Sequence, residues 1–188
     1  MLASVPDASK KKVPLVLGFH GQGYAPETWG PADAFTELAK ENGWVLAFPA
    51  GLREATTDGG SDVTWNVGTA ADNSTCVPDT NGVQCMESCH SLRSCGACNW
   101  ATCHDDGAFV DQVVKDLEAA LCIDTKRIFL VGESNGGMLV HYLIQRFPGR
   151  FRAAVPTFAL PLIGYLVGPQ YELLQQRALG IRDATEHQ

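Results

Sequence analysis

A serine flanked by small residues is the feature of this chain that most clearly indicates chemistry. Ser134 is the centre of GESNG at residues 132–136, after an apolar run at residues 127–131 and before a helix-like stretch. A serine in a sharp turn between a buried strand and a helix is typical of a nucleophile elbow, where small neighbours allow a strained backbone. The sequence therefore predicts that Ser134 is a nucleophile for acyl transfer.

Acyl transfer also requires donors for the oxyanion that forms when a serine attacks a carbonyl group. The backbone N–H of Asn135 is one donor by position, because the helix after Ser134 points its N-terminus toward that serine. The second donor is expected from the glycine-rich turn HGQG at residues 20–23, where Gln22 or Gly23 lies. We assign this role to the backbone N–H of Gln22.

The elements that must position these residues alternate between strand and helix. Short apolar runs predict buried strands at residues 13–19, 44–48, 127–131 and 151–156. Apolar residues at helical spacing predict helices at residues 31–41, 105–121 and 136–147. The alternation predicts an α/β fold with a parallel sheet and helices on both faces. Ser134 and residues 20–23 then meet at the carboxyl edge of the sheet, where such folds place their active crevice.

The composition restricts the fold and the partners. The chain has 188 residues, of which 45% are hydrophobic and 19% charged, with a net charge of −7. This length predicts a single domain, residues 1–188, with a sizeable core. The negative charge argues against nucleic acid as a partner. No apolar stretch reaches membrane-spanning length, no signal peptide is visible, and nothing indicates an obligate protein partner.

Six of the seven cysteines lie within residues 51–104, a segment without clear periodicity. We expect a long surface insertion stapled by disulfides, in a protein secreted to an oxidising compartment. A zinc site around Cys95, Cys98 and His90 is the alternative that the irregular spacings disfavour, and no metal is predicted. The seventh cysteine, Cys122, is expected either as a buried thiol or as a partner of the cluster.

Several stretches, in this order, resemble the poly(3-hydroxybutyrate) depolymerase and feruloyl esterase group of the α/β-hydrolase superfamily, which includes acetylxylan esterases. They are FHGQG at residues 19–23, WN at 65–66, DDGAFV at 105–110, CIDTKRI at 122–128 and GESNGG at 132–137. The resemblance covers residues 13–160. It implies a secreted serine esterase, without a cofactor, that cleaves carboxylic esters on plant polysaccharide or on a polyester.

The superfamily order of serine, acid and histidine is only partly present. Asp183 resembles the acid, but His187 lies four residues later and the chain stops at Gln188. His20 is structural in the family, and Glu133 stands where the family often has histidine. We therefore expect either that the chain is truncated at its C-terminus, and also at its N-terminus, or that its catalysis is impaired.

Two functions follow from this pattern. The first is a serine carboxylic ester hydrolase that forms an acyl-enzyme on Ser134. The second is a catalytically impaired, esterase-derived module whose insertion binds a partner or carbohydrate. The remaining histidines, His90, His104 and His141, are expected either in the cysteine-rich segment or too far along a helix to reach Ser134.

Overall fold

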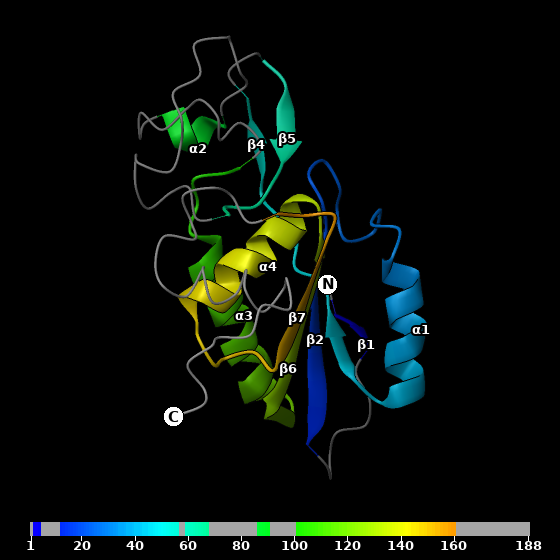
Figure 1. Ribbon diagram of the computed structural model, residues 1–188. Helices are drawn as coiled ribbons and strands as arrows, with labels where there is room; N and C mark the ends of the chain where they lie inside the picture. Colours follow the sequence, from blue (N-terminus) through cyan, green and yellow to red (C-terminus); the bar gives the residue numbers. More distant parts are fainter. Residues whose placement is uncertain (1, 5–11, 57–58, 68–85, 91–100, 161–188) are drawn as a thin grey trace, which may run out of the picture.

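The computed structural model describes residues 2–4, 12–56, 59–67, 86–90 and 101–160. Within them, the centre of the fold is a five-stranded sheet in the order β1-β3-β2-β6-β7 (Figure 1). Its strands are β1 (Leu2–Ser4), β2 (Val13–Phe19), β3 (Val45–Ala47), β6 (Ile123–Glu133) and β7 (Ala153–Thr157). The last four are parallel, as the sequence predicts. The antiparallel edge strand β1 is an addition that the sequence does not predict.

Three long helices connect these strands, each with ends close to its predicted bounds. They are α1 (Ala32–Asn42), α3 (Asp106–Ala120) and α4 (Asn135–Arg146). α1 lies on one face of the sheet, and α3 and α4 lie on the other (Figure 1). The prediction of a sheet covered on both faces is therefore confirmed. None of the described helices has the length and apolarity that a membrane span requires.

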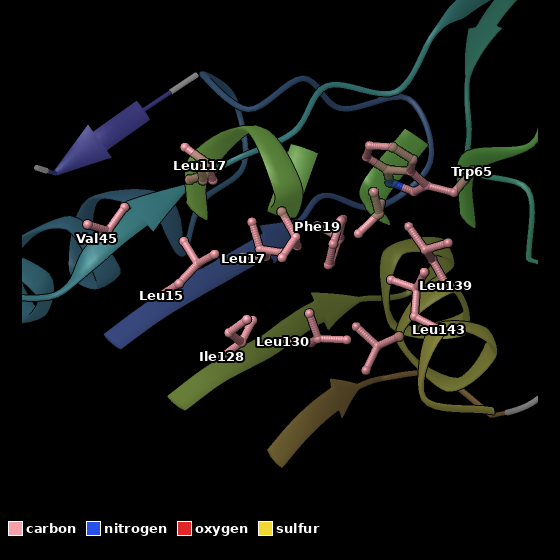
Figure 2. Packing of buried hydrophobic residues seen from close by; sticks show 14 of the residues in the cluster. Leu15, Leu17, Phe19, Val45, Trp65, Leu117, Ile128, Leu130, Leu139 and Leu143 are labelled. Carbon is pink, nitrogen blue, oxygen red and sulfur yellow. The ribbon is translucent and has the colours of Figure 1, made fainter. Parts of the chain in front are cut away.

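The alternation of side chains along β2 divides the core into two parts. Leu15, Leu17 and Phe19 are fully buried and face α3 and α4, whereas Val16 packs with residues of α1 on the opposite face. Figure 2 shows the first part, in which side chains of β2 and β6 lie beside those of α4. Full burial of one such leucine or phenylalanine contributes about 1.5–3 kcal/mol to stability.

Two large apolar side chains on these helices are exposed. Leu38 of α1 has 44% of its surface exposed, and Phe109 of α3 has 41%. Each comes directly before a buried residue, Ala39 or Val110, and adjacent helical residues point about 100° apart. The stripes that these helices bury are therefore narrower than the apolar pattern suggests.

Part of the expected surface insertion belongs to the core. Residues 51–67 contain a hairpin of β4 (Arg53–Ala55) and β5 (Ser61–Val63), and the short helix α2 (Glu87–His90) comes later. Trp65 is fully buried, and with Val67 it joins the cluster beneath α3 and α4. The surface prediction is therefore wrong for residues 63–67, which are buried, whereas most of the described residues in 51–62 lie at or near the surface. Residues 68–85 and 91–100 of the predicted insertion lie outside the described residues.

The connection from β6 to α4 packs directly against the end of β2. A β-carbon on Gly136 would collide with the backbone carbonyl oxygens of Phe19 and His20. A β-carbon on Gly132 would collide with the backbone carbonyl group of Gly136. Only residues without a side chain allow this approach, and it brings Ser134 to the turn that follows β2.

Gly136→Ala is therefore expected to destabilise the protein by about 1–3 kcal/mol, because the added methyl group must displace backbone rather than a side chain. Urea unfolding of the two proteins measures this difference. Gly30→Ala is the matched control, since a β-carbon there meets nothing within 4 Å. Equal midpoints for Gly136→Ala and the parent protein would show that the backbones do not meet as described.

Candidate active site

Ser134 occupies the turn between β6 and α4 in a conformation that few non-glycine residues adopt. Its φ is 53° and its ψ is −120°, a strained combination that costs about 1–3 kcal/mol and persists only where its surroundings enforce it. The Ser134 N–H donates to the carbonyl group of Thr157 over 3.0 Å, and the Ser134 carbonyl group accepts from Met138 N–H over 2.9 Å. The backbone is thus held on both sides, while the residue is exposed to solvent.

The turn after β2 lies against this serine. A β-carbon on Gly21 would stand 3.4 Å from the β-carbon of Ser134, so the two predicted halves of the site do meet at the carboxyl edge of the sheet. Of the two N–H groups considered for the second oxyanion donor, that of Gly23 donates to Val63 over 2.9 Å. Within the described part of the chain, the Gln22 N–H makes no hydrogen bond. The geometry therefore favours Gln22 over Gly23.

Asn135 is the first residue of α4, and its side chain is 2% exposed. Its Oδ1 accepts from the Trp65 N–H over 2.7 Å, and its Nδ2 donates to the Trp65 carbonyl group over 3.5 Å. The N–H groups in the first turn of a helix have no partner within the helix, and they point away from its N-terminus. The position of Asn135 is therefore compatible with its predicted role, and its side chain has a second task that the sequence did not reveal.

His20 is excluded as the base by its own hydrogen bonds. Its Nε2 accepts from the Gly51 N–H over 3.0 Å, so Nδ1 carries the proton and donates to the Gly21 carbonyl group over 2.8 Å. The ring is 1% exposed and packs on Trp65 with a centroid distance of 4.8 Å. Burial lowers the pKa of His20, which keeps the ring neutral. The structural role implied for His20 agrees with these contacts.

The other described histidines also bind elsewhere. His104 pairs with Glu54, with 3.5 Å between Nε2 and Oε2, and it is half exposed. His141 lies two turns into α4. Burial lowers its pKa, and its ring forms a hydrogen bond with the backbone of Ala159. The side chains of His90 and His187, and the predicted acid Asp183, lie outside the described residues.

Glu133, the residue before the nucleophile, binds toward α1. Its Oε2 accepts from Trp29 Nε1 over 2.8 Å, and Trp29 is 4% exposed in the smaller core cluster. This bond links the elbow to the segment that leads into α1. Sequence reasoning noticed the unusual residue at this position but had no signal for a partner 104 residues away.

The cysteines give a partial outcome. Cys89 and Cys103 form a disulfide, as expected for the cysteine-rich segment. Cys122 is a free and exposed thiol, so both expectations for it, burial and pairing with the cluster, are wrong. Among the described residues, no group of three or more potential ligands is arranged to hold a metal ion. The other four cysteines lie outside those residues.

The first residue of α3, Asp106, carries a buried carboxyl group. Asp106 is 6% exposed, and its Oδ2 accepts from the Asn66 N–H over 2.6 Å. Burial raises the pKa of Asp106 to about 6, and the Asn66 hydrogen bond and the nearby His104 only partly oppose this rise. The group is thus charged at neutral pH at a cost to the folded state.

The contribution of Asp106 to the free energy of unfolding should fall as the pH rises from 3.8, the ordinary pKa of the group, to about 6. In this range only the folded state keeps the proton on Asp106. Asp106→Asn removes this dependence and keeps an oxygen for Asn66. Relative to the parent protein, the variant should gain about 2 kcal/mol of unfolding free energy between about pH 4.5 and about pH 7.5. Denaturant unfolding at both pH values measures the gain. If the difference in unfolding free energy between the variant and the parent protein is the same at both pH values, the raised pKa is contradicted.

Comparison with known proteins gives a local family match and distant structural likenesses. Residues 105–160, which include α3, the elbow and β7, match the model of the prolyl oligopeptidase family. No curated protein sequence matches the chain.

Among solved structures, the chain is similar to an acetyl xylan esterase from Aspergillus awamori, with 17% identity and a TM-score of 0.46 over 80% of this chain and 43% of that one. It is similar to a thermostable esterase, with 17% identity and a TM-score of 0.48 over 81% and 35% of the two chains. A poly(3-hydroxybutyrate) depolymerase from Bordetella parapertussis gives 18% identity and a TM-score of 0.44 over 81% and 43%. The chain thus spans less than half the length of each of these structures.

Proposed function

We propose that this chain carries the nucleophile and oxyanion site of a serine carboxylic ester hydrolase. The observation that carries the proposal is the conformation of Ser134, an exposed serine at a φ of 53° between β6 and α4. Strain of this kind concentrates at functional sites, because it costs free energy and persists only where the surrounding structure enforces it. The turn at residues 20–23 meets Ser134 at the carboxyl edge of the sheet, which adds the surface on which an acyl group would lie.

The reaction proceeds in two halves. The Ser134 hydroxyl oxygen attacks the ester carbonyl carbon while a general base takes the hydroxyl proton, and the backbone N–H groups of Asn135 and Gln22 bind the oxyanion. The tetrahedral intermediate then breaks its bond to the alcohol oxygen, which leaves with the proton. Water attacks the resulting acyl-enzyme in the same manner, which releases the carboxylic acid and restores Ser134. Asp183 remains the proposed acid of the triad.

Two observations support the serine hydrolase, and the first of them also supports the proposed substrates. The series of motifs from residues 19–23 to residues 132–137 resembles feruloyl esterases, acetylxylan esterases and polyhydroxybutyrate depolymerases. The match to the prolyl oligopeptidase family also spans the elbow. We propose feruloyl or acetyl esters of plant polysaccharide, or a polyhydroxyalkanoate, as the substrate. The Cys89–Cys103 disulfide supports secretion to an oxidising compartment.

A second function is favoured by the histidines. Among the described residues, none of the histidines with a described side chain is hydrogen-bonded to Ser134, and His20, His104 and His141 have other partners. A serine without a base is a weak nucleophile. The alternative is therefore a module derived from an esterase, in which the cysteine-rich segment binds a protein or carbohydrate and Ser134 is silent.

Turnover of p-nitrophenyl acetate decides between the two functions. The parent protein is expected to hydrolyse it, and Ser134→Ala should lose at least about a hundredfold in kcat/KM. Ser61→Ala is the matched control, since Ser61 is an exposed serine on β5. Equal rates for the Ser134 variant and the parent protein would sink the hydrolase, and no turnover by either would favour the module. Methyl ferulate, acetylated xylan and poly(3-hydroxybutyrate) as substrates then assign the acyl group.

A further inference from the structure

The turn that carries Gln22 has little packing of its own. Gln22, Gly23 and Tyr24 are all exposed, so the core does not determine where their backbone points. A short segment at residues 62–67, which we name the bracing segment, binds this turn. An oxyanion donor must keep its direction before the substrate arrives, and the bracing segment is positioned to provide that restraint.

The exposed end of the bracing segment holds the turn through two bonds. Asp62 Oδ2 accepts from Gln22 Nε2 over 2.6 Å, and the Val63 carbonyl group accepts from the Gly23 N–H over 2.9 Å. The other carboxylate oxygen of Asp62 accepts from the Val63 N–H over 2.7 Å. Both oxygens are therefore used, and the carboxylate is held in one orientation by its own strand.

The buried end of the bracing segment is anchored beside the nucleophile. Trp65 is fully buried, its Nε1 donates to the His20 carbonyl group over 2.9 Å, and its backbone exchanges two bonds with the Asn135 side chain. The Asn66 N–H donates to Asp106 at the start of α3. Asp62 thus extends from a rigid support, and a supported side chain positions its partner better than a mobile one.

One segment therefore binds both proposed oxyanion donors, Gln22 at its exposed end and Asn135 at its buried end. We propose that Asp62 is a positioning residue that sets the direction of the Gln22 backbone N–H relative to that of Asn135. The inference rests on the proposed hydrolase, and it adds a residue that neither the motif series nor the elbow contains. It predicts an effect on the transition state rather than on substrate binding, because the oxyanion exists only there.

The kinetic test uses Asp62→Ala and Gln22→Ala, each of which removes one side of the bond and leaves the Gln22 N–H in place. Each should lower kcat for p-nitrophenyl acetate about tenfold with KM unchanged, which is less than the loss of a whole donor. The kcat of the double variant should be no lower than that of the less active single variant, since both changes remove the same interaction. Asp62→Asn keeps an oxygen for the Val63 N–H, and its amide nitrogen can donate to the Gln22 amide oxygen once that amide turns over. This variant should therefore retain most of the kcat.

Asp124→Ala is the matched control. Asp124 also accepts from a backbone N–H, that of Lys126 over 3.1 Å, and from a side chain, Arg127 over 2.7 Å, but at the opposite end of the sheet. It should leave both kinetic constants unchanged. Unchanged kcat in Asp62→Ala, a rise in KM alone, or fully additive losses in the double variant would overturn the positioning role.

Hydrogen exchange tests the same restraint without any turnover. The Gly23 amide should exchange faster in Asp62→Ala than in the parent protein, whereas the amides of α4 should not change. Loss of activity in Ser134→Ala together with unaltered exchange and kcat in Asp62→Ala would refute the inference and leave the hydrolase intact. Retained activity in Ser134→Ala would refute the hydrolase, and faster Gly23 exchange would then support only the structural restraint.

Discussion

The contact between two backbones at Gly136 is the constraint on which the site depends. The first turn of α4 lies directly on the carbonyl groups at the end of β2, with no side chain between them. This contact lies two residues after Ser134, and it leaves the chain little room to leave the strained conformation at that serine. It also brings the turn after β2 beside the serine. The proposed nucleophile and the two proposed oxyanion donors thus lie around one close backbone contact rather than on separate loops.

Buried hydrogen bonds near this contact determine how the packed elements are oriented. Trp65, Asn135, Asn66 and Asp106 are almost fully buried and bonded to one another or to nearby backbone. In a medium of low dielectric such bonds are strong when satisfied and costly when broken, so they select one arrangement where apolar contacts would tolerate several. The raised pKa of Asp106 shows that burying this carboxyl group has a cost. We infer that the network contributes orientation more than stability.

Much of the fold follows from local sequence, whereas the site is only partly accessible from it. Apolar runs and helical spacing locate the four parallel strands and three helices because each pattern reports the burial of a face. Trp65 lies in a polar segment without periodicity, so nothing local indicates that it enters the core. Glu133 and Asn135 bind partners distant in sequence through side chains that are usually exposed. Such hydrogen bonds depend on how distant elements pack together, and this packing cannot be predicted from the local pattern of a single sequence.

The most direct measurement of the central claim is covalent trapping of the nucleophile. Diethyl p-nitrophenyl phosphate phosphorylates an activated serine and releases p-nitrophenol, and peptide mass spectrometry then locates the phosphoryl group. The account predicts a single adduct on the peptide that contains Ser134, formed together with the loss of esterase activity. An unmodified Ser134 peptide after activity is lost, or an adduct on Ser61 or Cys122 instead, would contradict it.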